Sequence, residues 1–84
     1  MNIQVNLQLP DTIFSALRKT PDEFVSEMRV TAAVKWYEMQ LVSQAKAAEI
    51  AGLSRHDFLL ALNRFNVSPF QTTPEELLKE IERD

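Results

Sequence analysis

The fold is decided by the longest uninterrupted helical pattern in the chain, Thr20-Pro-Asp-Glu-Phe-Val-Ser-Glu-Met-Arg-Val-Thr-Ala-Ala-Val-Lys-Trp-Tyr-Glu-Met-Gln-Leu-Val42. Thr20 is a hydroxyl cap, Pro21 occupies the first helical position, and Glu23 follows three residues after the cap, which together form a helix start signal. No glycine or proline interrupts residues 22 to 42. The sequence therefore predicts one long helix over residues 21–42.

This helix is apolar on two sides. At a 3.6-residue period, one stripe contains Val25, Met28, Ala32, Trp36 and Met39, and the other contains Val30, Ala33, Val34, Tyr37 and Leu41. A chain of 84 residues has too little other structure to cover both sides. We therefore expect one stripe to face the chain's own short helices and the other to face a second copy. The second stripe, with Val30, Val34, Tyr37 and Leu41, is assigned to the dimer interface.

Residues 2 to 9 alternate strictly between apolar and amide side chains, which predicts a β-strand with one buried face. No other strand pattern occurs in the chain, and a lone strand leaves its backbone groups unpaired. The symmetric solution is an antiparallel pairing of this strand with its copy in a dimer. The apolar side chains assigned to that interface are Ile3, Val5 and Leu7.

The order of strand, short helix (residues 11–19) and long helix resembles the ribbon-helix-helix module of bacterial repressors. Such modules lay a two-stranded ribbon in the major groove of DNA, where side-chain amides match adenine. The resemblance implies that Gln4, Asn6 and Gln8 read bases and that Arg29 contacts phosphate. The outward residues of the strand are all neutral amides, whereas such modules commonly carry a basic residue there.

The pattern of residues 43 to 65 predicts a second unit. It consists of a short alanine-rich helix, a turn at Gly52 and a helix that begins at the capping sequence Ser54-Arg-His-Asp57. This pattern resembles a helix-turn-helix, in which Arg55, His56 and Asn63 are the exposed DNA readers of the second helix. The alternative is a helical hairpin that serves only for packing. Leu60 falls on the outward side, which suits a protein interface better than phosphate.

Residues 66 to 84 predict a loop followed by a short helix over about 74–83. The whole net charge of −3 lies in this segment, which favours a basic protein partner. We expect a mainly α-helical single domain with three parts, at residues 1–42, 43–65 and 66–84. The residues assigned to partner binding are Leu60, Phe70, Leu77, Leu78 and Ile81.

The chemistry of an enzyme is not expected from this composition. The chain has no cysteine, which excludes disulfides and thiolate sites and fits a reducing cytoplasm. Ser54, His56 and Asp57 point in different directions from one helix start and cannot align as a hydrolytic triad. With one histidine and no cysteine, we expect no metal and no cofactor, and no apolar run reaches the length of a membrane span.

The whole chain is also similar to uncharacterised protein family 0175 of prokaryotes. The resemblance is carried by Val5-Asn-Leu-Gln-Leu-Pro10, Thr20-Pro-Asp-Glu-Phe24, Ala32-Ala-Val-Lys-Trp-Tyr37 and above all Lys46-Ala-Ala-Glu-Ile-Ala-Gly-Leu-Ser54. Members are often encoded beside PIN-domain ribonuclease toxins and are read as antitoxins. The resemblance implies a dimeric DNA-binding autoregulator that sequesters its toxin through the C-terminal segment. The alternative is a small protein-interaction module that binds no DNA.

Overall fold

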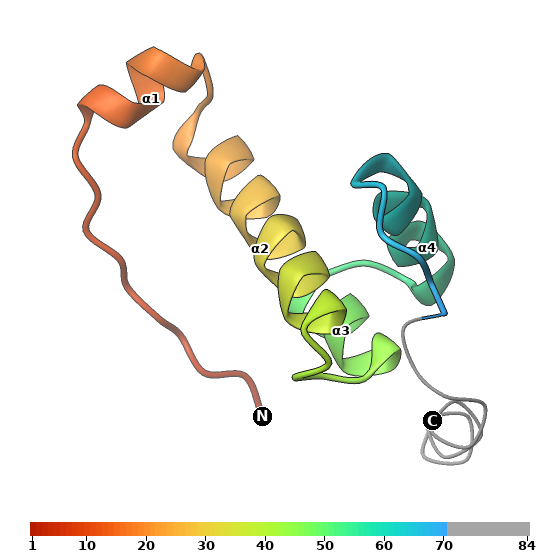
Figure 1. Cartoon of the computed structure of the whole chain (residues 1–84). Helices are drawn as coiled ribbons and strands as arrows, with labels where there is room; N and C mark the ends of the chain where they lie inside the picture. Colours follow the sequence, from red (N-terminus) through yellow and green to blue (C-terminus); the bar gives the residue numbers. More distant parts are fainter. Residues whose placement is uncertain (71–84) are drawn as a thin grey trace.

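A computed structural model describes residues 1–70 of the chain and consists there of four α-helices (Figure 1). The helices are α1 (Thr12–Leu17), α2 (Pro21–Glu38), α3 (Gln44–Ala51) and α4 (Arg55–Arg64). In Figure 1, α2 forms the long central axis, α3 lies at its C-terminal end, and α1 lies at its start. No helix in residues 1–70 is long and apolar enough to cross a membrane.

The predicted start of α2 is confirmed in detail. The Thr20 hydroxyl accepts a hydrogen bond from the backbone N–H of Glu23 at 3.2 Å, and the Thr20 backbone N–H donates to the Glu23 carboxylate at 3.4 Å. The helix ends at Glu38 rather than at the predicted residue 42. Gln40 takes a left-handed conformation with φ of 63°, which turns the chain back so that α3 can pack on α2.

Helices α2, α3 and α4 enclose one core. Three alanines on α3 let that helix approach α2 closely, and Tyr37 meets Phe58 edge to face with ring centroids 6.0 Å apart. A smaller contact holds α1, where Phe14 and Phe24 pack at 5.4 Å. The buried apolar core residues are Val30, Ala33, Val34, Tyr37, Ala47, Ala48, Ala51, Phe58, Ala61, Leu62 and Val67.

The stripe of α2 that the sequence assigned to the dimer interface packs inside the chain itself. Val30, Val34 and Tyr37 retain only 9%, 3% and 1% of their exposure, because α3 and α4 of the same chain cover them. These three side chains are therefore not available to a second copy, and their assignment to the dimer interface was wrong. Of that stripe only Leu41 is exposed. The other stripe is open, with Val25, Trp36 and Met39 exposed.

The predicted N-terminal β-strand is also corrected. Residues 1–10 form an extended chain that is exposed throughout, and residues 1–70 contain no β-strand (Figure 1). The alternation of apolar and amide residues is real, but a strand requires a neighbour for its backbone hydrogen bonds, and the four helices offer none. The ribbon pairing, and with it the ribbon-helix-helix part of the expected fold, is therefore absent.

The helical hairpin of residues 43–65 forms as predicted. Ser43 and Ser54 cap α3 and α4 by accepting hydrogen bonds from backbone N–H groups three residues later, each at 3.1 Å. Gly52 ends α3 in the left-handed conformation, with φ of 72°. The apolar spacing predicts that Phe58, Leu59, Leu62 and Phe65 face inward on α4. Phe58 and Leu62 do point into the core, whereas Leu59 and Phe65 are exposed and Ala61 takes the inner position.

We expect Gly52→Ala to lower the free energy of unfolding by roughly 1–2 kcal/mol, because a left-handed backbone is unfavourable for a residue with a Cβ. A Cβ at this position would also lie 3.1 Å from Nη1 of Arg29. Gly52→Asn is the control, since asparagine tolerates this conformation better and should lose less stability in chemical unfolding. Equal stability of Gly52→Ala and the natural protein would contradict this explanation of the turn.

Most of the predictions made for residues 66–84 concern residues outside the described range 1–70. The helix expected over residues 74–83, with Leu77, Leu78 and Ile81, lies outside residues 1–70. In the preceding loop, Val67 is buried at 8% exposure, but Phe70 is exposed at 74%.

Candidate functional site

An apolar groove runs along the outer side of α2. Its volume is about 450 Å³, and its apolar lining comes from the end of α1 and from one side of α2. Lys19, Glu27, Thr31 and Lys35 form the polar border. The large apolar side chains Leu17 and Trp36 are 51% and 43% exposed there. The apolar lining residues are Leu17, Phe24, Met28, Ala32 and Trp36.

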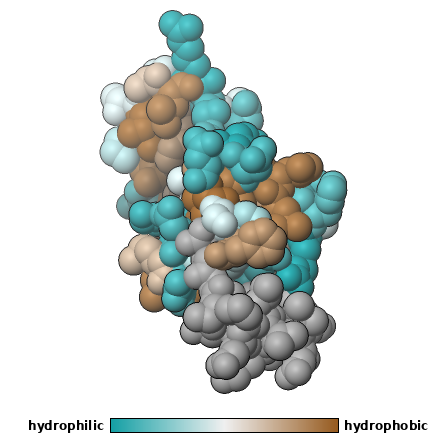
Figure 2. Space-filling view, turned by 45° about the vertical axis from the view of Figure 1, so that its right-hand side comes forward, coloured by the Kyte–Doolittle hydropathy of each residue, from teal (hydrophilic) through white to brown (hydrophobic). Residues whose placement is uncertain are grey.

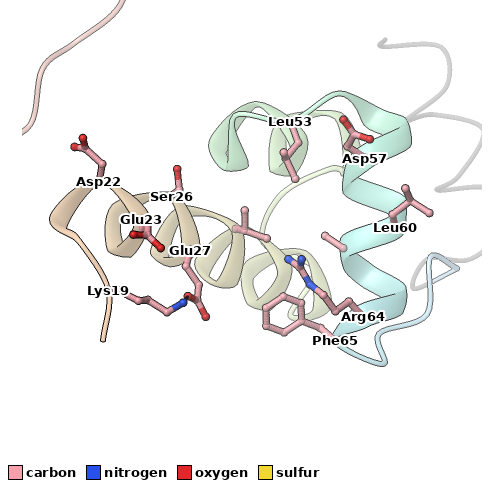
Figure 3. A pocket seen from close by; sticks show the side chains of 12 residues that line it. Lys19, Asp22, Glu23, Ser26, Glu27, Leu53, Asp57, Leu60, Arg64 and Phe65 are labelled. Atoms are coloured by element: carbon pink, nitrogen blue, oxygen red, sulfur yellow. Dashed lines mark ion pairs between the residues drawn. The ribbon is translucent and has the colours of Figure 1, made fainter. Parts of the chain in front are cut away.

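A second groove, of about 960 Å³, lies between the first half of α2 and α4 (Figure 3). Its residues include the apolar Leu53, Leu60 and Phe65 and several carboxylates. Glu27 forms an ion pair with Lys19 at 2.7 Å, and this hydrogen bond and the carboxylate charge raise the pKa of Lys19 above its ordinary value. Lys19 and Glu27 line both grooves, so this ion pair separates the two apolar surfaces.

The surface of the molecule is partly apolar. In Figure 2, apolar side chains reach the surface in more than one place among hydrophilic neighbours. The predicted partner-binding residues Leu60 and Phe70 are among the exposed hydrophobic residues, at 57% and 74%. The predicted interface residues Ile3, Val5 and Leu7 are exposed as well, at 79%, 73% and 58%.

The residues predicted to read DNA do not form one surface. Gln4, Asn6 and Gln8 lie on the exposed N-terminal segment, outside the helical core. His56 and Asn63 are exposed on α4.

Arg29 has a structural contact that its sequence position did not reveal. Its Nε donates to the carbonyl oxygen of Ile50 at 2.8 Å, and its Nη2 donates to the carbonyl of Glu49 at 3.4 Å. These carbonyls belong to the last turn of α3, beyond which the regular helical donors end, and the Glu49 carbonyl also accepts the backbone N–H of Gly52 at 3.1 Å. Arg29 therefore caps α3 and fixes it against α2.

We expect Arg29→Gln to lower the free energy of unfolding by about 1 kcal/mol, since a charge-assisted hydrogen bond to the end of α3 is lost. Lys35→Gln on the same helix is the control, because the exposed ion pair of Lys35 with Glu38 contributes little. Chemical unfolding of both variants measures the difference. Unchanged stability of Arg29→Gln would show that this cap is not significant.

Arg55 belongs to a polar network that the sequence did not predict. Its Nη2 donates to Oε1 of the buried Gln44 at 2.8 Å, and the Tyr37 hydroxyl donates to the Pro69 carbonyl at 2.6 Å. Nε2 of Gln44 lies 3.4 Å from the Tyr37 hydroxyl. The network thus joins all three core helices and the loop after α4. Nothing in the sequence around Gln44 distinguishes it from an exposed residue at a helix start.

The chemically reactive residue types do not converge. The Ser54 hydroxyl accepts the backbone N–H of Asp57, so it serves as a helix cap. Within residues 1–70, no three histidine, aspartate or glutamate side chains gather in a group that could hold a metal ion. The candidate functional sites of the described part are its two grooves.

Comparison with known proteins identifies the relatives of this chain. A UPF0175 protein of Archaeoglobus fulgidus is 39% identical over 80 residues, which cover 95% of this chain and 88% of the relative. A UPF0175 protein of Aeropyrum pernix is 38% identical over 66 residues, 79% of this chain and 73% of the relative. No solved structure matches the chain significantly. The profile described as "Uncharacterised protein family (UPF0175)" matches residues 1–83, and the chain therefore belongs to this family.

Proposed function

We propose that this protein is the antitoxin of a toxin–antitoxin pair, a homodimer that binds a PIN-domain ribonuclease and keeps it inactive. The observation that carries the proposal is the amount of apolar side chain at the surface. Fourteen large hydrophobic residues are exposed within residues 1–70, among them Trp36, Leu60 and Phe70. Monomeric soluble proteins rarely leave contiguous apolar patches open, so surfaces of this kind serve for binding.

The outer side of α2 is the surface that we assign to the dimer. Its apolar stripe runs along α2 from Val25 to Trp36, with Met39 just past the end of the helix, and two copies of such a stripe can bury each other by the same contacts. In this stripe the bulky Trp36 and Met28 lie beside the small Ala32. Helix packing requires such an alternation of ridges and grooves. The exposed apolar side chains Ile3, Val5, Leu7 and Leu41 extend the surface available to the second copy.

The charge distribution supports a ribonuclease as partner. Residues 71–84 contain Lys79 and Arg83 against five acidic residues, namely Glu75, Glu76, Glu80, Glu82 and Asp84. A ribonuclease binds a polyanion, so the surface that receives RNA is basic. An acidic segment with the apolar residues Leu77, Leu78 and Ile81 is suited to cover such a surface and compete with RNA. The family resemblance points to the same partner.

DNA binding with autoregulation is the second candidate function. The specific observation in its favour is the hairpin of α3 and α4, with Gly52 in the turn and His56 and Asn63 exposed on the second helix. Residues 1–70 contain seven basic and seven acidic residues, so we expect weak attraction to phosphate. A shift assay with the chain's own upstream DNA at two salt concentrations tests this function.

The main proposal is tested by the RNA cleavage rate of a PIN-domain ribonuclease from the same genome, measured with and without the full chain. We expect cleavage to stop once the chain is present in slight excess over the ribonuclease. Bovine serum albumin at the same concentration controls for nonspecific protein effects. Unchanged cleavage together with no complex on gel filtration would contradict the antitoxin function.

A further inference from the structure

We propose that the groove between α2 and α4, called here the α2–α4 groove, receives a basic amphipathic helix of the ribonuclease (Figure 3). This inference rests on the proposed function and adds to it a second contact surface, separate from the acidic C-terminal segment. The occupant is defined by its chemistry, a helix with one apolar face and lysine or arginine beside that face.

The shape of the groove suits a short helical segment. On α2 its lining extends from Asp22 to Val30, which corresponds to about 12 Å of helix, or slightly more than two turns. Apolar side chains from α2, α4 and the turn before α4 supply the contact surface. Leu60 projects furthest, with 57% of its surface exposed, and Phe65 is 36% exposed. The apolar lining residues are Val30, Leu53, Leu60, Ala61 and Phe65.

The border of the groove is acidic. Its lining includes four carboxylates and two basic groups. The carboxylates are those of Asp22, Glu23, Glu27 and Asp57, and the basic groups are those of Lys19 and Arg64. Figure 3 shows Asp22 and Asp57 on different helices, at the starts of α2 and α4.

Both basic groups at the border are already engaged. Lys19 forms its ion pair with Glu27 at 2.7 Å, and the Arg64 guanidinium carbon lies 5.6 Å from the centroid of the Phe65 ring. None of the salt bridges among the described residues includes Asp22 or Asp57. Their charges are therefore available to attract cations on a partner.

The charge also decides between possible occupants. Residues 71–84 of the chain itself carry five acidic and two basic residues, so the acidic border disfavours them. Nucleic acid is disfavoured for the same reason. A second copy is assigned to the outer side of α2, beyond the ion pair of Lys19 and Glu27. A basic partner helix satisfies both the apolar lining and the acidic border.

Leu60→Ser tests the apolar part of the groove, with a PIN-domain ribonuclease as the probe and calorimetric titration as the measurement. We expect the dissociation constant to rise about tenfold, because a central apolar contact is removed. Leu59→Ser is the matched control, since Leu59 lies on the same helix, is 38% exposed and does not line the groove. It should bind almost as the natural chain does. Circular dichroism checks that both variants are folded.

The double variant Asp22→Asn, Asp57→Asn tests the acidic border without changing side-chain shape. We expect weaker binding and a smaller dependence of the dissociation constant on salt concentration, because two charge contacts are lost. The control is Glu38→Gln, Glu49→Gln, which removes two exposed carboxylates outside the groove.

The outcomes separate the two proposals. If the natural chain binds the ribonuclease and both groove variants bind it equally well, the groove proposal is overturned and the antitoxin function remains. If the natural chain does not bind the ribonuclease at all, the antitoxin function fails and the groove proposal fails with it. Selective loss of binding in the groove variants, with unchanged controls, supports the groove as the docking site.

Discussion

Trp36→Glu is expected to convert the proposed homodimer into monomers at micromolar concentration. Trp36 is 43% exposed near the C-terminal end of the outer stripe of α2, and a dimer along this stripe would bury it. A carboxylate there would be removed from water without a partner. Large aromatic anchors commonly contribute more than 2 kcal/mol to an interface, which is about a thirtyfold change in the dissociation constant.

Size-exclusion chromatography with light scattering measures this change. Leu59→Glu is the matched control, because it also replaces a partly exposed apolar side chain by a carboxylate but lies on α4, away from the stripe. The control should remain a dimer. A Trp36→Glu protein that keeps the mass of the natural chain would place the dimer interface elsewhere.

Tyr37→Ala is expected to lower the free energy of unfolding by about 3–5 kcal/mol, as is usual when a large buried aromatic side chain is truncated. Tyr37 is only 1% exposed and packs on Phe58. Its hydroxyl also donates to the Pro69 carbonyl at 2.6 Å. Small domains have little stability in reserve, so we expect this variant to be largely unfolded by circular dichroism.

Tyr37→Phe separates the hydroxyl from the ring. It should lose about 1 kcal/mol, since the Pro69 carbonyl is left without the hydroxyl donor and Nε2 of Gln44 without the hydroxyl acceptor. Chemical unfolding at two protein concentrations distinguishes a role of Tyr37 in the core of its own chain from a role in the dimer interface. If either variant mainly weakened dimerisation while the monomer stayed stable, the placement of Tyr37 in the core of its own chain would be contradicted.

The local signals in the sequence predicted the helices well. Thr20 and Ser54 cap their helices as expected, and Gly52 takes the left-handed conformation that its position between two helices indicated. These features depend on a few neighbouring residues, so the sequence contains all the information needed to recognise them.

The choice between the two stripes of α2 could not be made from sequence. Both stripes are apolar at the same helical period, so the hydrophobic pattern alone ranks them equally. The inner stripe carries Ala33 and Val34, which allow the alanine-rich α3 to approach closely, and Tyr37, which packs edge to face on Phe58 of α4. The size of the facing residues decides the packing, and this is a property of two helices together.

The candidate site was also only partly predictable. The outward position of Leu60 was predicted from its helical phase and is confirmed. Arg29 and Arg55 were assigned to DNA because a basic side chain on a helix surface suggests phosphate, but each has a hydrogen-bond acceptor from a distant part of the chain. The acidic border of the α2–α4 groove was missed, since Asp22 and Asp57 are separated by the whole of α3 in the sequence.

Sedimentation of the full chain, alone and with a PIN-domain ribonuclease, tests the central claim that the exposed apolar surfaces are binding surfaces. Alone, the chain should sediment as a species of twice its 9.7 kDa mass at micromolar concentration. With the ribonuclease, the dimer should be replaced by a larger species that contains both proteins. A chain that sediments at 9.7 kDa under both conditions, with the ribonuclease unchanged beside it, would contradict the account.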